Sequence, residues 1–211
     1  MKRIALLVSA LVFCGVACTG VPQPQPVPGL MRRSTPGLTQ KKTLLVGLEG
    51  AVGLSSKVSI LVRGASATVT ASASPKGAFS AVLSATAGAI LEVSFETADG
   101  PSATVTLVPT DVTRGPMLSK GLVFGSAVSA PDAQGIVTVS NDDPTDPPFS
   151  ASANTQALVS NSRTGELVSN TTDAKGALTV KLAGKTGDQI HILLAEPGSF
   201  STSDFLAYTV P

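Results

Sequence analysis

The sequence predicts an all-β protein with two tandem β-sandwich domains, preceded by a signal peptide and a Pro-rich tether. One phrase is written twice: KGAFSAVLSATAGAILEV, residues 76–93, returns ninety-nine positions later as KGALTVKLAGKTGDQIHI, residues 175–192. In both copies apolar residues alternate with polar ones around Gly-containing turns, which is typical of half-buried strands. After residue 20 no segment keeps the 3.6-residue apolar period of a helix.

The first twenty residues, MKRIALLVSALVFCGVACTG, have the features of a secretory signal peptide, predicted over residues 1–17. Lys2 and Arg3 form a basic start, the run from Ile4 to Val12 is apolar, and small residues follow. The apolar run is too short for a stable membrane span.

The end of this segment, Gly15-Val16-Ala17-Cys18, resembles the lipobox of bacterial lipoproteins. The resemblance implies cleavage before Cys18 and lipidation of its sulfur, which would hold the protein in the cell envelope by an N-terminal lipid anchor. Thr19 after the cysteine then implies the outer membrane, or the cell surface, in a Gram-negative cell. The alternative is an ordinary secretory signal with a chance cysteine.

Residues 18–41 are expected to form a Pro-rich tether. The stretch VPQPQPVPG places a proline at every second position from 22 to 28. Proline fixes φ and has no N–H to donate, so these residues favour an extended, partly polyproline II chain. The alternative is a Pro-rich motif that binds a partner.

The repeated phrase predicts two copies of one β-domain, over residues 42–110 and 133–211. Each copy places apolar residues at alternate positions before and after its central turn, and each ends on Val-Pro. Residues 111–132 are expected to be a linker, with Gly121 to Ala130 as a candidate for an extra strand that starts the second domain. His191, between Ile190 and Ile192, is predicted to face away from the core and to be exposed.

The turn residues of the second copy resemble those of bacterial Ig-like repeats. They read Asn161-Ser162-Arg163-Thr164-Gly165, Asp173-Ala174-Lys175-Gly176 and Gly187-Asp188-Gln189-Ile190. The first copy departs from this pattern at Ala89, where Asp is expected. The resemblance implies two Ig-like β-sandwiches and says little about function. A transthyretin-like sandwich is the alternative fold.

Catalytic chemistry is not indicated, and no catalytic residue is predicted. The chain has one histidine, His191, and no G-x-S-x-G motif. Its formal net charge of +1 leaves no electrostatic footprint for nucleic acid.

One loop, SNDDPTDPPFS at residues 140–150, is a candidate calcium site. Asp142, Asp143 and Asp146 lie close together beside Asn141, and Ca²⁺ prefers several hard oxygen ligands held close together. The alternative is a solvated turn, because Asn, Asp and Pro are common turn residues.

These features together predict a non-catalytic cell-envelope lipoprotein whose Ig-like domains bind a protein or glycan partner or act as a spacer. Two alternatives stay open. One is a structural or adhesin subunit that assembles through β-edge contacts. The other is a Ca²⁺-dependent binding module; no other cofactor is expected.

Overall fold

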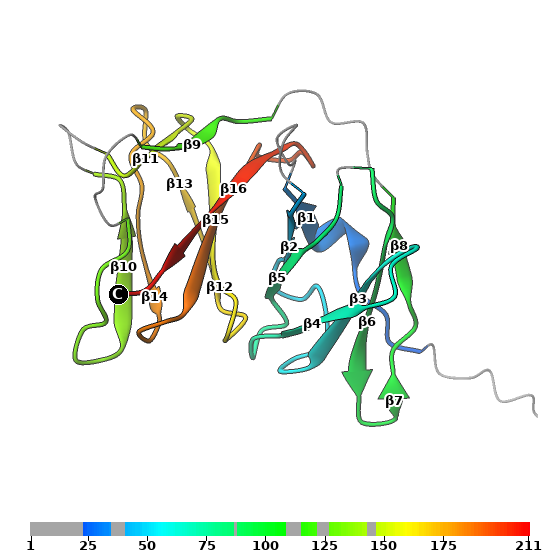
Figure 1. The fold of residues 1–211 in the computed structure, drawn as a ribbon. Helices are drawn as coiled ribbons and strands as arrows, with labels where there is room; N and C mark the ends of the chain where they lie inside the picture. The colour runs from blue at the N-terminus through cyan, green and yellow to red at the C-terminus, as the bar shows by residue number, and fades with distance from the viewer. Residues whose placement is uncertain (1–22, 35–40, 87, 109–114, 122–126, 143–146) are drawn as a thin grey trace, which may run out of the picture.

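The computed structural model describes residues 23–34, 41–86, 88–108, 115–121, 127–142 and 147–211. In these ranges the chain forms sixteen strands and one 3₁₀ turn, η1 (Pro28–Leu30). The strands make two antiparallel sandwiches that lie side by side (Figure 1). The predicted all-β fold class with two sandwiches is confirmed. No helix among the described residues is long and apolar enough to cross a membrane.

The first sandwich encloses its own apolar core between two sheets. One sheet has the order β1 (Met31–Arg33), β2 (Thr43–Gly47), β5 (Phe79–Leu83). The other has the order β4 (Thr68–Ser72), β3 (Lys57–Val62), β6 (Leu91–Thr97), β7 (Gly100–Pro101), with β8 (Val105–Leu107) also paired to β6.

The second sandwich has a separate core. Its four-stranded sheet has the order β13 (Leu167–Thr171), β12 (Gln156–Asn161), β15 (Gln189–Ala195), β16 (Thr202–Thr209). The opposite layer consists of two pairs, β10 (Ile136–Ser140) with β14 (Thr179–Ala183), and β9 (Leu118–Lys120) with β11 (Phe149–Ala151). Strand β9 falls within the range predicted as a linker but pairs inside the second sandwich.

Both copies of the repeat have the same strand order. The run β4-β3-β6-β8 corresponds to β13-β12-β15-β16, and the pair β2-β5 corresponds to β10-β14. The register agrees residue by residue: Ile60 lies opposite Val93, and ninety-nine positions later Val159 lies opposite Ile192. The repeated phrase therefore encodes one sandwich twice.

The predicted tether is wrong for residues 23–34, which are part of the first sandwich. Strand β1 pairs with β2 at the edge of its sheet, and the Met31 side chain is buried in the core. The Val27 N–H donates to the Ala51 carbonyl at 2.8 Å. The alternate prolines end at residue 28, so the next residues keep the N–H groups that a strand needs. Of the remaining tether residues, the exposed Lys41 directly precedes the first sandwich, and residues 18–22 and 35–40 lie outside the described ranges.

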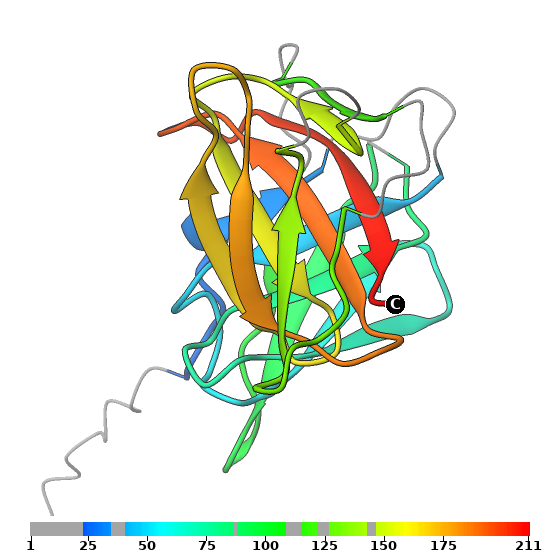
Figure 2. The same cartoon turned by 90° about the vertical axis from the view of Figure 1, so that its left-hand side faces the viewer.

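A third apolar cluster joins the two sandwiches face to face. It contains Leu44 and Val46 of β2, Leu158 of β12, Leu193 and Ala195 of β15, and Phe205 of β16. The sheet β1-β2-β5 therefore packs with its outer face on the outer face of the sheet β13-β12-β15-β16 (Figure 1). Seen from the left-hand side of Figure 1, the second sandwich lies in front of the first (Figure 2).

Contacts at the rim of this interface join further segments. The Thr202 hydroxyl donates to the Arg33 carbonyl, and the Arg32 guanidinium carbon lies 4.7 Å from the centre of the Phe200 ring. Gly165 approaches the first sandwich so closely that a Cβ there would lie 2.2 Å from the Ser72 carbonyl oxygen. A side chain at this turn would push the two sandwiches apart.

The two copies differ at the positions that form this interface. Leu158 and Leu193 are fully buried, whereas Ser59 and Ser94, their equivalents ninety-nine positions earlier, are half-buried on the free face of the first sandwich. In the other layer, Val82 packs against the interface cluster whereas its equivalent, Lys181, is exposed. Each copy is therefore apolar on the one outer face that meets the other copy.

Leu158→Ala should lower the free energy of unfolding by about 2–5 kcal/mol, because it leaves a cavity in the layer between the sandwiches. Ser59→Ala is the matched control at the equivalent position and should change stability little. Urea denaturation at pH 7 measures both. An equal effect of the two substitutions would contradict the face-to-face packing.

Candidate functional site

A cleft of about 650 Å³ opens beside the apolar interface, and both sandwiches line it. The first sandwich contributes Lys42, Val69, Thr70, Ser80, Ala81 and Val82. The second contributes Ser162, Gln189, His191, Phe205, Leu206 and Ala207. Ligand sites often lie at such junctions between domains, and this volume is within their usual range.

The cleft runs along outer strands of the described sheets. Three consecutive residues of β5 (80–82) and three of β16 (205–207) line it. Consecutive side chains of a strand point to opposite faces, so a cavity that touches three in a row also touches the strand edge. Strands β5 and β16, like β4 beside them, are the outer strands of their sheets. Main-chain groups therefore form part of the cleft wall.

The side chains of the cleft wall are mostly apolar or uncharged. Val69, Val82 and Phe205 give it an apolar strip, while hydroxyl and amide groups supply hydrogen-bonding positions. Among the described lining residues, Lys42 is the one with a formal charge at neutral pH, and it is exposed. The cleft therefore favours a ligand that carries an anionic group.

His191 is buried between the sandwiches, so its predicted exposure is wrong. Its side chain does face away from the core of its own domain, as alternation requires, but the first sandwich covers it and leaves it 4% exposed. Its ring meets Phe205 edge-on, with 5.8 Å between the ring centres. Burial lowers the pKa of His191 to about 4, so the imidazole is neutral at pH 7.

Three polar atoms in this layer are buried without a hydrogen-bond partner among the described residues: Ser80 Oγ, Ser160 Oγ and His191 Nδ1. Ser160 and His191 lie opposite each other on β12 and β15. An unpaired buried polar group costs about 1–3 kcal/mol. These three groups therefore reduce the stability that the layer joining the sandwiches contributes.

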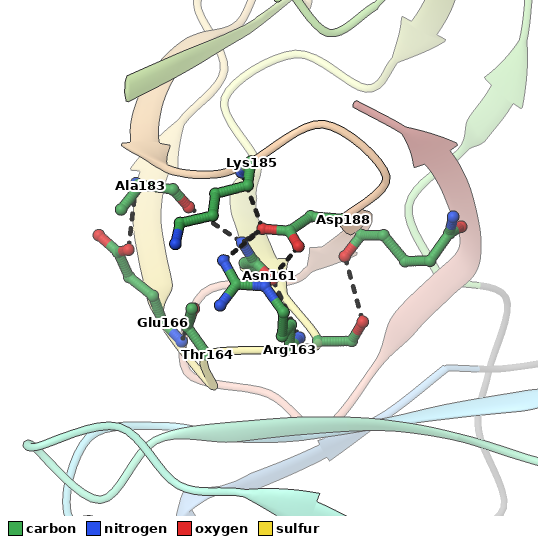
Figure 3. Close-up of polar contacts among 9 residues, drawn as sticks. Asn161, Arg163, Thr164, Glu166, Ala183, Lys185 and Asp188 are labelled. Atoms are coloured by element: carbon green, nitrogen blue, oxygen red, sulfur yellow. Dashed lines mark hydrogen bonds and ion pairs between the residues drawn. The ribbon is translucent and has the colours of Figure 1, made fainter. Parts of the chain in front are cut away.

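A network of charged and polar groups fixes the turn after β12 (Figure 3). The buried Asp188 carboxylate accepts hydrogen bonds from the Arg163 guanidinium, from Asn161 Nδ2 at 2.7 Å and from the Lys185 N–H at 2.9 Å. The Arg163 hydrogen bond, helped by that of Asn161 and opposed by burial, holds the pKa of Asp188 far below its usual value.

This network also positions the cleft wall. Ser162 lies between Asn161 and Arg163, and Gln189 follows Asp188; both line the cleft. The same turn carries Gly165, which touches the first sandwich. The motif that resembles Ig-like turns therefore holds one end of the interface in place.

The first copy replaces the network with apolar packing. Val62 and Ala89 stand at the positions of Asn161 and Asp188, and both pack against the first core. The departure at Ala89 is thus matched by a second one at Val62, and together they leave no buried charge to satisfy.

The predicted lipidation and metal residues lie largely beyond the described ranges. Cys18, Asp143 and Asp146 are outside them. Asp142 is exposed, and the buried Asn141 uses its side chain to hold the loop, accepting from the Leu178 N–H at 2.7 Å. Within the described residues no three His, Cys, Asp or Glu side chains are grouped to hold a metal ion. The calcium site stays a prediction.

The cleft was not predicted from the sequence, although one sequence pattern indicates the contact beside it. The runs LLV at 44–46 and ILLA at 192–195 are apolar without alternation. Such runs indicate strands buried on both faces. They mark the two strands that meet between the sandwiches.

No protein-family model matches the chain, and no curated protein matches it. Solved structures give distant likenesses. A bacterial ice-binding adhesin has 15% identity and a TM-score of 0.28, covering 80% of this chain and 57% of its own length. A segment of two fibronectin type III domains from chicken tenascin has 15% identity and a TM-score of 0.27, covering 88% and 97%. A DUF3823 family protein from Parabacteroides merdae has 11% identity and a TM-score of 0.26, covering 85% and 98%.

Acidification should destabilise the protein through His191. The folded-state pKa is about 4, below its ordinary value, so between these two values the unfolded chain binds a proton that the folded protein does not. The contribution is complete above pH 6.5 and falls by about 3 kcal/mol towards pH 4. Urea denaturation at a series of pH values should show this slope, and His191→Leu should remove it. Equal slopes for both proteins would contradict the burial of His191.

Asp188→Asn should lower the free energy of unfolding at pH 7 by about 1–3 kcal/mol, because the amide removes the negative charge and replaces one of the two oxygens that accept from Asn161, Arg163 and Lys185 with a donor. A lowered carboxylate pKa stabilises above the unfolded value and is lost as pH falls through the folded value, so the difference from the native protein should shrink only below about pH 4. Asp99→Asn, at an exposed hairpin carboxylate, is the control. A similar loss for both variants would rule out the network.

Proposed function

We propose that the protein is a non-catalytic cell-envelope lipoprotein whose two Ig-like sandwiches act as one body and bind a protein or glycan partner. The observation that carries this proposal is the cleft that both sandwiches line beside their shared apolar layer. Neither sandwich could form it alone, so the way the two pack creates the binding surface.

The packing favours a binding role over a spacer role. A spacer extends its reach by placing domains end to end, whereas these sandwiches stack sheet on sheet. Four stacked sheets separated by about 10 Å span roughly 30 Å, little more than the length of one domain. Face-to-face stacking therefore makes the protein shorter than an end-to-end arrangement would, and it forms a surface to which both sandwiches contribute.

The chemistry of the cleft supports a non-catalytic role. A nucleophilic triad needs an acid that orients the imidazole beside a serine. Among the described residues, none hydrogen-bonds to Nδ1 of His191, and burial keeps the ring neutral without activating it. Hydroxyl, amide and apolar groups around one lysine suit binding.

The envelope location rests on Cys18 and is tested in cells. Native protein and Cys18→Ala are compared by membrane fractionation and by protease treatment of intact cells. We expect the native protein in the membrane fraction and the variant released. If the variant fractionates like the native protein, the lipid anchor is wrong. Cleavage of the native protein from outside would place it on the cell surface.

The binding role is tested by site-specific photo-crosslinking in the same cells. A photoreactive amino acid replaces Ala207, which lines the cleft, or Ala133, an exposed alanine in a turn of the second sandwich away from the cleft. We expect a crosslinked adduct from position 207 and none from 133. Matching results from both positions, or no adduct from either, would contradict a partner in the cleft.

A further inference from the structure

We propose that the cleft takes an extended peptide of a partner protein, which carries a carboxylate near Lys42 and adds as a strand to the edge of β16 at residues 205–207, where no other described strand pairs on that side. The proposal rests on the binding role of the cleft and names the chemical class of its partner.

The hydrogen bonds and register of β16 show which of its main-chain groups in the cleft point away from β15. The Phe205 N–H donates to the Asp204 carboxylate at 2.8 Å, so it points away from β15. In an antiparallel pair, hydrogen-bonded and non-hydrogen-bonded residues alternate along the strand. Phe205 lies opposite Leu193 and Ala207 opposite His191, so both occupy non-hydrogen-bonded positions. The N–H and carbonyl of Ala207 therefore point outwards, into the cleft.

An extended peptide fits this arrangement. A strand presents donors and acceptors at every second residue, which is the spacing of the free groups on β16. Its alternate side chains would enter the strip between β16 and the first sandwich, against Val69, Val82 and Phe205. This strip continues the apolar layer that already joins the sandwiches, to which Val82 and Phe205 also belong.

The positive charge of Lys42 favours a peptide that carries a carboxylate, either at its C-terminus or on a side chain. Lys42 is exposed, and the ion pairs within the described residues do not include it. The described lining residues include no carboxylate. A peptide with a free C-terminus or an acidic side chain would pair with Lys42 without repulsion from the wall.

The test uses an array of nine-residue synthetic peptides with free carboxyl ends, probed with the purified full-length protein. The tightest peptide is then resynthesised with single backbone N-methyl groups at successive positions. Strand addition predicts a period of two: methylation of one alternate set weakens binding at least about tenfold, and the other set is tolerated, because only alternate N–H groups face β16.

Two pairs of variants locate the site on the protein. Ala207→Trp fills the cleft and should abolish binding of the selected peptide, whereas Ala133→Trp should not. Lys42→Glu should weaken binding about fivefold, and the neighbouring Lys41→Glu, outside the cleft, should have little effect. Circular dichroism confirms that each variant is folded.

Failure of strand addition is distinguishable from failure of the proposed function. If no peptide binds, or methylation shows no period of two, or Ala207→Trp behaves like Ala133→Trp, strand addition is overturned. A crosslinked partner at position 207 in cells would then still support the binding role, with a glycan or a flat protein surface as the occupant. An adduct of twice the protein's mass would show a second copy in the cleft and would also overturn the peptide proposal.

Discussion

The apolar layer between the two sandwiches is the contact on which the rest of the structure depends. It joins the outer faces of two sheets through Leu44, Val46, Leu158, Leu193 and Phe205. Because this layer is buried, His191 loses contact with water, Gly165 must lack a side chain, and the edges of β5 and β16 come to flank one cleft. Without it, the chain would be two separate sandwiches with polar edges and no shared surface.

The two copies of the repeat share one fold but differ in the residues on their outer faces. Both copies keep the core alternation and the strand order, so each can fold around its own centre. They differ on their outer faces, where Leu193 replaces Ser94 and Val82 stands in place of Lys181. The contact between the copies is heterologous, because the sheet β1-β2-β5 of the first copy meets the sheet β13-β12-β15-β16 of the second, and these two sheets are not equivalent in the repeat. The remaining outer faces carry polar residues such as Ser59, Ser94 and Lys181, which disfavour further stacking of the same kind.

How far the sequence predicts the structure depends on the range of the interactions involved. Alternation in 178–182 and 190–194 is local, so the strands and turns could be predicted. The Asn161 and Asp188 turn could be found as a motif, although its contact with the first sandwich could not. His191 was misplaced because alternation shows which side of a strand a residue occupies, but not what covers that side. The alternate prolines obscured β1, whose Met31 completes the first core.

Residual dipolar couplings of backbone N–H groups, measured in a weakly aligning medium, test most directly whether the two sandwiches behave as one body. Couplings from strands β3 and β6 report the orientation of the first sandwich, and those from β12 and β15 report that of the second. The face-to-face packing predicts that one alignment tensor fits both sets in the arrangement of Figure 1. Two tensors of different magnitude or orientation would show sandwiches that move independently and would contradict the shared layer and the cleft.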